Sequence, residues 1–150
     1  MNRNTLGKLW VALQFGLLLT LAVLCLKEGQ QTDPSFWSWG LWFASAALGF
    51  WTLSVNQPGN FNIRPEPRLD GRLVQLGPYR WVRHPMYGAV LLLAAGAAVW
   101  LANAIGAGLW MALLAVLIAK ARLEERWLME HYPQYADYRR RTWRLLPGVY

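Results

Sequence analysis

The sequence predicts an all-α integral membrane protein with about four transmembrane helices, a site at the cytoplasmic face and a short C-terminal helical segment. Hydrophobic residues make up 55% of the 150 residues, charged residues make up 15%, and ten residues are tryptophan. This composition is too apolar for a water-soluble domain of this size. The hydrophobic residues also fall in long blocks rather than stripes, so they face lipid or one another. By length, residues 1–150 form a single membrane domain.

The first block, residues 9–26, contains no charged side chain and is about long enough to cross ~30 Å of hydrocarbon as a helix. Arg3 and Lys8 precede it, as in a signal peptide, but no small-x-small cleavage site follows, so we interpret it as an uncleaved anchor. After the polar stretch 28–35, a second block, 36–55, begins with aromatic residues typical of a membrane interface. Two transmembrane helices are therefore expected in the first third of the chain.

Residues 85–119 carry no formal charge, yet one helix of that length would be about 52 Å long and would exceed one bilayer. The chain is expected to turn back near Asn103 and Gly106, which favour turns. This predicts two further transmembrane helices, at about 85–101 and 105–121. Small residues on the first of these would let a neighbouring helix approach closely.

The polar segments are predicted to share one side of the membrane. Apart from Lys27, every lysine and arginine lies near the N-terminus, in the loop 56–84, or from Lys120 onward into the tail 122–150. Because loops rich in these residues stay cytoplasmic, we expect both termini and the loop in the cytoplasm, at a bacterial inner membrane. In the tail the fourth helix is expected to continue to about His131 before a second, short helical piece.

The net charge of +7 then reflects this topology, and no nucleic-acid partner is expected, because the arginines alternate with membrane segments. The expected partners are membrane lipids and a lipophilic small-molecule or lipid substrate. The oligomeric state is left open.

The stretch GPYRWVRHPMY, residues 77–87, places three basic residues directly before a predicted membrane helix. Gly77 and Pro78 favour a turn, and Pro85 suits the first position of a helix. Arg83 and His84 are therefore expected at the membrane interface. They can be interpreted as an anchor to lipid head groups within an aromatic belt, or as part of a site.

The second cluster of polar residues is the pair Glu124 and Glu125, about one turn beyond the end of the fourth predicted span. A helix ion pair is one interpretation, because Glu125 lies three residues after Arg122. The two glutamates also lie at the same predicted membrane depth as Arg83 and His84, an arrangement that suits capture of a zwitterionic small molecule.

The chain resembles the isoprenylcysteine carboxyl methyltransferase and phospholipid methyltransferase family of integral membrane enzymes, over roughly residues 60–148. The resemblance is carried by L-V-x-x-GPYR-x-x-RHPMY at 73–87, by the paired glutamates, and by Y-x-x-Y followed by L-P within 135–147. It implies S-adenosylmethionine as the cofactor, enclosed at the cytoplasmic face by the loop before the RHP element and by the C-terminal segment.

The resemblance also implies roles for individual residues. The resemblance places Arg83 near the reacting end of the cofactor. From side-chain chemistry, Arg83 and His84 are expected to be catalytic, and Arg83 and Arg139 are expected to bind the substrate, because arginine can orient a carboxylate and histidine can accept a proton. The residues expected to border or hold the cofactor are Tyr79, His84, Pro85, Tyr87, Glu124, Glu125, Tyr135 and Tyr138.

The residues present suit methyl transfer, which needs alignment of two reactants and exclusion of water rather than a metal. No metal site is expected, because His84, His131 and Cys25 are the only histidines and cysteine in the sequence, too few to favour a zinc site with three protein ligands. The acceptor is expected to be lipophilic or lipid-attached and to present a carboxylate, a thiol or an amine. Two alternatives stay open, namely an NADPH-dependent membrane reductase related to sterol reductases and a non-catalytic membrane assembly protein.

Overall fold

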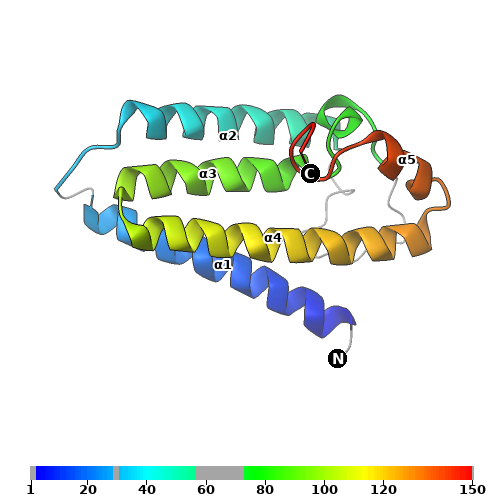
Figure 1. Ribbon diagram of the computed structural model, residues 1–150, viewed down its shortest axis with the longest axis horizontal. Helices are drawn as coiled ribbons and strands as arrows, with labels where there is room; N and C mark the ends of the chain where they lie inside the picture. Colours follow the sequence, from blue (N-terminus) through cyan, green and yellow to red (C-terminus); the bar gives the residue numbers. More distant parts are fainter. Residues whose placement is uncertain (1–2, 29–30, 57–72, 150) are drawn as a thin grey trace.

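The computed structural model describes residues 3–28, 31–56 and 73–149. Its elements are α1 (Arg3–Glu28), α2 (Phe36–Val55), the short 3-10 helix η1 (Gly77–Arg80), α3 (Pro85–Leu101), α4 (Ala104–His131) and α5 (Tyr135–Arg141). Helices α2, α3 and α4 lie side by side along the long axis, while α1 is inclined and packs on α3 and α4 (Figure 1). The N-terminal end of α1, α5 and the C-terminal segment lie at the same end of the bundle (Figure 1).

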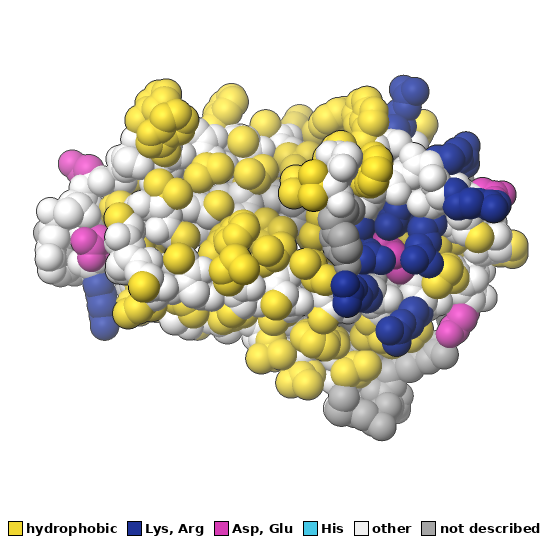
Figure 2. Space-filling model, viewed as in Figure 1, with side chains coloured by type: hydrophobic (Ala, Val, Ile, Leu, Met, Phe, Trp, Pro, Cys, Tyr) yellow, Lys and Arg dark blue, Asp and Glu magenta, His cyan; other side chains and the backbone are white. Residues whose placement is uncertain are grey.

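The predicted fold class, an all-α integral membrane protein, is confirmed. Thr5–Glu28 and Ala104–His131 are each long and apolar enough to cross a membrane. Helix α3 is apolar but shorter, at 17 residues. Helix α2, whose sequence includes tryptophan, serine and threonine, is not among the helices that meet this criterion. The total of four spans therefore stays a prediction. Hydrophobic side chains cover much of the visible surface, and lysine and arginine gather at the end that carries α5 (Figure 2).

The predicted ranges 36–55 and 85–101 coincide with α2 and α3. The other two helices extend beyond the ranges 9–26 and 105–121, because polar residues at the membrane surface continue them. Most of the predicted loop 56–84, namely residues 57–72, lies outside the described residues.

Helices α2 and α3 pack closely because a glycine and polar side chains meet between them. A Cβ atom at Gly96 would lie 2.4 Å from Nε1 of Trp42 and 3.1 Å from the backbone oxygen of Ser38. Trp42 Nε1 donates to the carbonyl of Leu93 at 3.1 Å, and Ser45 Oγ donates to the carbonyl of Ala89 at 2.8 Å. Small residues allow such approach in membranes, as predicted for this helix.

The chain turns back between α3 and α4 over two residues. Ala102 ends α3 in the left-handed conformation, with φ 48°. Asn103 then caps α4, because its side chain accepts a hydrogen bond from the N–H of Gly106 at 2.8 Å. The turn expected near Asn103 is therefore present, and it places the C-terminal half of α4 beside the N-terminal end of α3.

The C-terminal segment is attached to the chain before α3. Val82 and Trp143 form an isolated parallel bridge, and no strand occurs among the described residues. Trp143 N donates to the carbonyl of Trp81 at 2.8 Å, and Arg83 N donates to the carbonyl of Trp143 at 2.8 Å. The tail is thus held against the residues that lead into α3.

Candidate active site

The site forms where the N-terminal end of α3 meets the C-terminal half of α4. Pro85 occupies the first turn of α3, where its missing N–H removes no helical hydrogen bond. His84 is the N-cap, with φ −123° and ψ 59°. Glu124 and Glu125 face this junction from α4, and the tail covers it.

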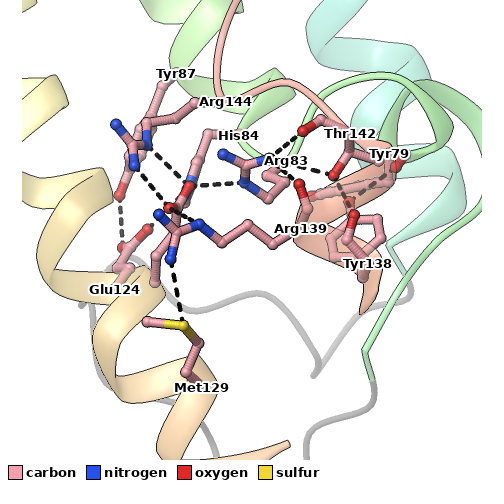
Figure 3. A network of polar contacts seen from close by, with 11 residues as sticks. Tyr79, Arg83, His84, Tyr87, Glu124, Met129, Tyr138, Arg139, Thr142 and Arg144 are labelled. Atoms are coloured by element: carbon pink, nitrogen blue, oxygen red, sulfur yellow. Dashed lines mark hydrogen bonds and ion pairs between the residues drawn. The ribbon is translucent and has the colours of Figure 1, made fainter. Parts of the chain in front are cut away.

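Glu125 is the centre of a polar network that joins three segments of the chain. Its side chain is 3% exposed, and Arg83 Nε donates to its Oε1 at 2.8 Å. Arg144 donates from Nε to Oε1 at 3.0 Å and from Nη2 to Oε2 at 2.9 Å. Arg139 lies further away, at 3.8 Å (Figure 3). Because a bidentate arginine–carboxylate pair is strong and directional, Glu125 fixes the tail beside α3.

These contacts decide between two interpretations of Glu125. Among the described residues its ion-pair partners come from positions 83–84 and 139–144, and none comes from its own helix. Among the described residues, Glu125 therefore forms no ion pair with Arg122 or Arg126 of its own helix. Removing one partner of a buried ion pair typically destabilises a protein by about 3–5 kcal/mol, so Glu125 is important for the fold of the site.

Glu124 has a different environment from its neighbour. Tyr87 Oη donates to its Oε1 at 2.5 Å, and Nδ1 of His84 lies 3.3 Å from its Oε2. The ring of His84 also stacks on Tyr87, with centroids 5.2 Å apart. Glu124 thus contacts neutral or histidine partners, whereas the arginines converge on Glu125.

His84 lies between the two carboxylates. Its Nε2 is 3.3 Å from Oε1 of Glu125, and its Nδ1 faces Glu124. Burial disfavours the charged ring, but the hydrogen bonds and charges of both glutamates outweigh burial and raise the pKa of His84. A ring with an acceptor at each nitrogen is favoured as the imidazolium, which has no free site for another proton.

The tail reaches across the site to η1. Tyr138 Oη donates to the carbonyl of Tyr79 at 2.8 Å, and Arg83 Nη1 donates to the carbonyls of Arg139 and Thr142 (Figure 3). Asn56 Nδ2 donates to Tyr79 Oη at 3.4 Å. Burial raises the pKa of Tyr79 to about 12, so this phenol is neutral at physiological pH.

A pocket of about 470 Å³ opens beside this network. Such a volume is typical of small-molecule sites. Its lining includes six of the predicted site residues: Tyr79, Arg83, His84, Pro85, Tyr87 and Glu124. The other residues that line it are Gln14, Phe15, Leu18, Asn56, Met86, Val90, Leu93, Lys120 and Leu128.

The remaining predicted residues, Glu125, Tyr135, Tyr138 and Arg139, do not line this pocket. Glu125, Tyr138 and Arg139 contribute to the network around it, as described above. Tyr135 is 1% exposed, and its hydroxyl has no hydrogen-bond partner among the described residues. A buried hydroxyl without a partner is unfavourable. The roles assigned to all these residues from the sequence stay predictions.

A second cavity, of about 500 Å³, lies between α1, α2 and α3. Apolar side chains provide nearly all of its lining, and Phe15, Leu18 and Leu93 line both cavities. The first pocket, which is mostly apolar but carries the charged side chains, therefore adjoins an apolar groove along the helices.

Sequence reasoning missed three contributors to the site. Arg144 precedes the L-P element and was indistinguishable from the other tail arginines, because spacing does not show which of them reaches Glu125. Gln14 and Lys120 form a hydrogen bond at 2.9 Å across 106 positions of sequence. Lys120 could have been found from its place at the end of an apolar helix, since ionisable residues in membrane helices are often functional.

Comparison with known proteins agrees with the resemblance drawn from the motifs. Over 83 residues the chain is 37% identical to the cobalt-zinc-cadmium resistance protein CzcN of Cupriavidus metallidurans, which covers 55% of this chain and 38% of that protein. The chain thus spans well under half the length of this relative. The profile of the phospholipid methyltransferase family matches residues 39–135, which include α3, most of α2, all of α4 and the paired glutamates. The chain belongs to the phospholipid methyltransferase family.

Proposed function

We propose that this protein is an S-adenosylmethionine-dependent methyltransferase that acts on a lipophilic or lipid-attached small acceptor. Membership of the phospholipid methyltransferase family supports a membrane methyltransferase in general. It does not favour the alternatives, a nicotinamide-dependent reductase and a non-catalytic assembly protein. The acceptor presents a carboxylate, a thiol or an amine.

The observation that carries this proposal is that two cavities adjoin and share part of their lining. The pocket beside Glu124 has polar and charged side chains, as a zwitterionic cofactor requires, and the adjoining groove is apolar. Phe15, Leu18 and Leu93 connect them. A polar cofactor and an apolar acceptor can thus approach the same point from different sides, which is the alignment that group transfer needs.

The residues present fit the cofactor. Glu124 offers a carboxylate to its hydroxyl or ammonium groups, and Tyr79, His84 and Tyr87 provide rings against which an adenine can pack. When bound, the cofactor supplies an electrophilic methyl group on a sulfonium. The chain's own part is to bind, to orient and to exclude water.

We assign the site to the cytoplasmic face of a bacterial inner membrane, because the basic side chains gather at the same end of the bundle (Figure 2). The metal resistance in the name of the relative from Cupriavidus metallidurans is not assigned to this chain, since the aligned part covers only 38% of that protein.

Isothermal titration of the detergent-purified protein with S-adenosylmethionine, S-adenosylhomocysteine and NADPH tests the proposal. We expect binding of the first two and none of NADPH. Glu124→Gln should weaken that binding about tenfold to a hundredfold, since a hydrogen bond to a charged group contributes about 1.5–3 kcal/mol.

The matched control is Glu28→Gln, at the other end of the bundle, which should bind as the wild type does. NADPH binding without S-adenosylmethionine binding would support the reductase instead. Absence of binding by all three ligands would support a non-catalytic role.

A further inference from the structure

Lys120 is a buried cation that lines the pocket. It has no role in the cofactor contacts proposed above. It lies on α4 one turn before Glu124 and is 2% exposed. Its Nζ donates to Oε1 of Gln14, on α1, at 2.9 Å. It also lies 5.0 Å from the ring centroid of Tyr87. An ionisable side chain at such a place in a membrane helix is unfavourable unless it is partnered or functional.

Lys120 makes no direct ion pair, although the charge of Glu124 acts on it from one turn further along α4. Arg83, Arg144 and His84 all contact Glu125, and His84 also contacts Glu124. Lys120, by contrast, forms no ion pair with any carboxylate of the described residues. Its direct contacts are one neutral amide and one aromatic face, which leave donors of the ammonium for a ligand. An ammonium has three donors, so Lys120 is poised for an anion in the pocket.

We propose that Lys120 and Gln14 together bind a carboxylate group of a ligand in this pocket. The ammonium supplies the positive charge, and the side-chain amide of Gln14, whose oxygen accepts from Lys120, has two N–H groups for a second bond. One ammonium matches the single charge of a carboxylate. An amine acceptor would bring a second cation beside Lys120 and is disfavoured.

The carboxylate has two sources under the proposed function, on which this inference builds. One is the amino-acid part of S-adenosylmethionine, and the other is the methyl acceptor. The position favours the acceptor, because Gln14 and Phe15 both line this pocket and Phe15 also lines the apolar groove. A carboxylate held here has an apolar space for its hydrocarbon chain next to it.

A purely structural role for Lys120 makes a different prediction. If the lysine only packs α1 against α4, Lys120→Met preserves the volume and removes a buried charge. Stability is then unchanged or higher, and the affinity for ligands is unchanged. The carboxylate site instead requires that ligand affinity falls in the same variant.

The test uses the full chain in lipid nanodiscs and two kinds of probe. Quenching of tryptophan fluorescence by 9,10-dibromostearate, compared with its neutral methyl ester, reports a carboxylate on an apolar chain, since Trp42 lines the groove. Calorimetric titration with S-adenosylhomocysteine reports the cofactor carboxylate. The variants are Lys120→Met and Gln14→Glu, the second of which keeps the lysine but supplies an internal carboxylate. Lys27→Met, at an exposed position, is the matched control.

We expect the wild type and Lys27→Met to bind dibromostearate about tenfold more tightly than the ester. Both pocket variants should lose this preference while their affinity for S-adenosylhomocysteine changes less than about twofold. If that affinity falls instead and the preference persists, the carboxylate belongs to the cofactor. Unchanged binding of both probes in variants that unfold at the wild-type temperature overturns the inference. A wild type that prefers dibromostearate but does not bind S-adenosylhomocysteine refutes the methyltransferase proposal and leaves the carboxylate site standing.

Discussion

The protonation of His84 depends on the two glutamates that face its ring nitrogens. Its two ring nitrogens face Glu124 and Glu125, its ring stacks on Tyr87, and Arg83 and Arg144 reach it only through Glu125. The sequence placed His84 and Glu124 beside one pocket, because both belong to motifs at the ends of apolar blocks. The sequence did not show that the two glutamates have different environments. Adjacent residues on a helix face different neighbours, and the fold of the tail determines that its arginines contact Glu125.

The charge state of His84 predicts a pH-dependent stability. Its pKa is raised in the folded protein, where the glutamates outweigh burial, above the ordinary value of 6.5. The protonated ring therefore stabilises the fold. This contribution is fully present below about pH 6.5 and is lost as the pH rises through the higher folded pKa. In detergent the temperature of unfolding of the wild type should fall across this range.

His84→Gln supplies the control, because glutamine keeps a donor but does not titrate. Its unfolding temperature should vary less with pH over the same interval. Equal slopes in the two proteins would show that His84 is not the titrating group.

At the scale of elements, the bounds of α2 and α3 could be predicted because sharp signals mark them. Pro85 begins α3, and the turn-forming Asn103, which caps α4, limits it. The expected continuation of the fourth helix to about His131 agrees with the end of α4. The ends of α1 could not be predicted from apolar character, since a helix continues beyond the hydrocarbon wherever polar residues keep helical geometry. Nor could the pairing of Val82 with Trp143, which depends on how the tail folds back.

The packing of α2 on α3 predicts that two glycine-to-alanine substitutions change the free energy of unfolding in opposite directions. Gly96→Ala places a methyl group 2.4 Å from Nε1 of Trp42, so it should destabilise the protein by about 1–3 kcal/mol, as overpacking does. Gly40→Ala, on α2, meets nothing within 4 Å and should be neutral or stabilise by up to about 1 kcal/mol, because alanine favours helix more than glycine. Chemical denaturation in detergent measures both. A Gly96→Ala variant as stable as Gly40→Ala would contradict the close contact.

For the whole molecule, the distribution of charge links topology to function. Lysine and arginine side chains gather at the end that carries α5 (Figure 2), and the first pocket opens near that end, beside Glu124. S-Adenosylmethionine is made and used in the cytoplasm, so the proposed function requires this end to be cytoplasmic. The positive-inside tendency independently favours the same orientation.

Cysteine labelling in intact cells tests the orientation after the native thiol is removed by Cys25→Ala. Asp33→Cys, in the connection between α1 and α2, should react with a membrane-impermeant maleimide, whereas Ala136→Cys, in α5, should react only after the cells are permeabilised. Both positions are exposed, so access to the reagent depends on the side of the membrane rather than on burial. Labelling of Ala136→Cys in intact cells would place the pocket on the outer side, away from the cofactor, and would refute the topology and the proposed cofactor together. That result would not affect the carboxylate site at Lys120, because this site depends on the contacts between α1 and α4. It does not depend on which side of the membrane the pocket faces.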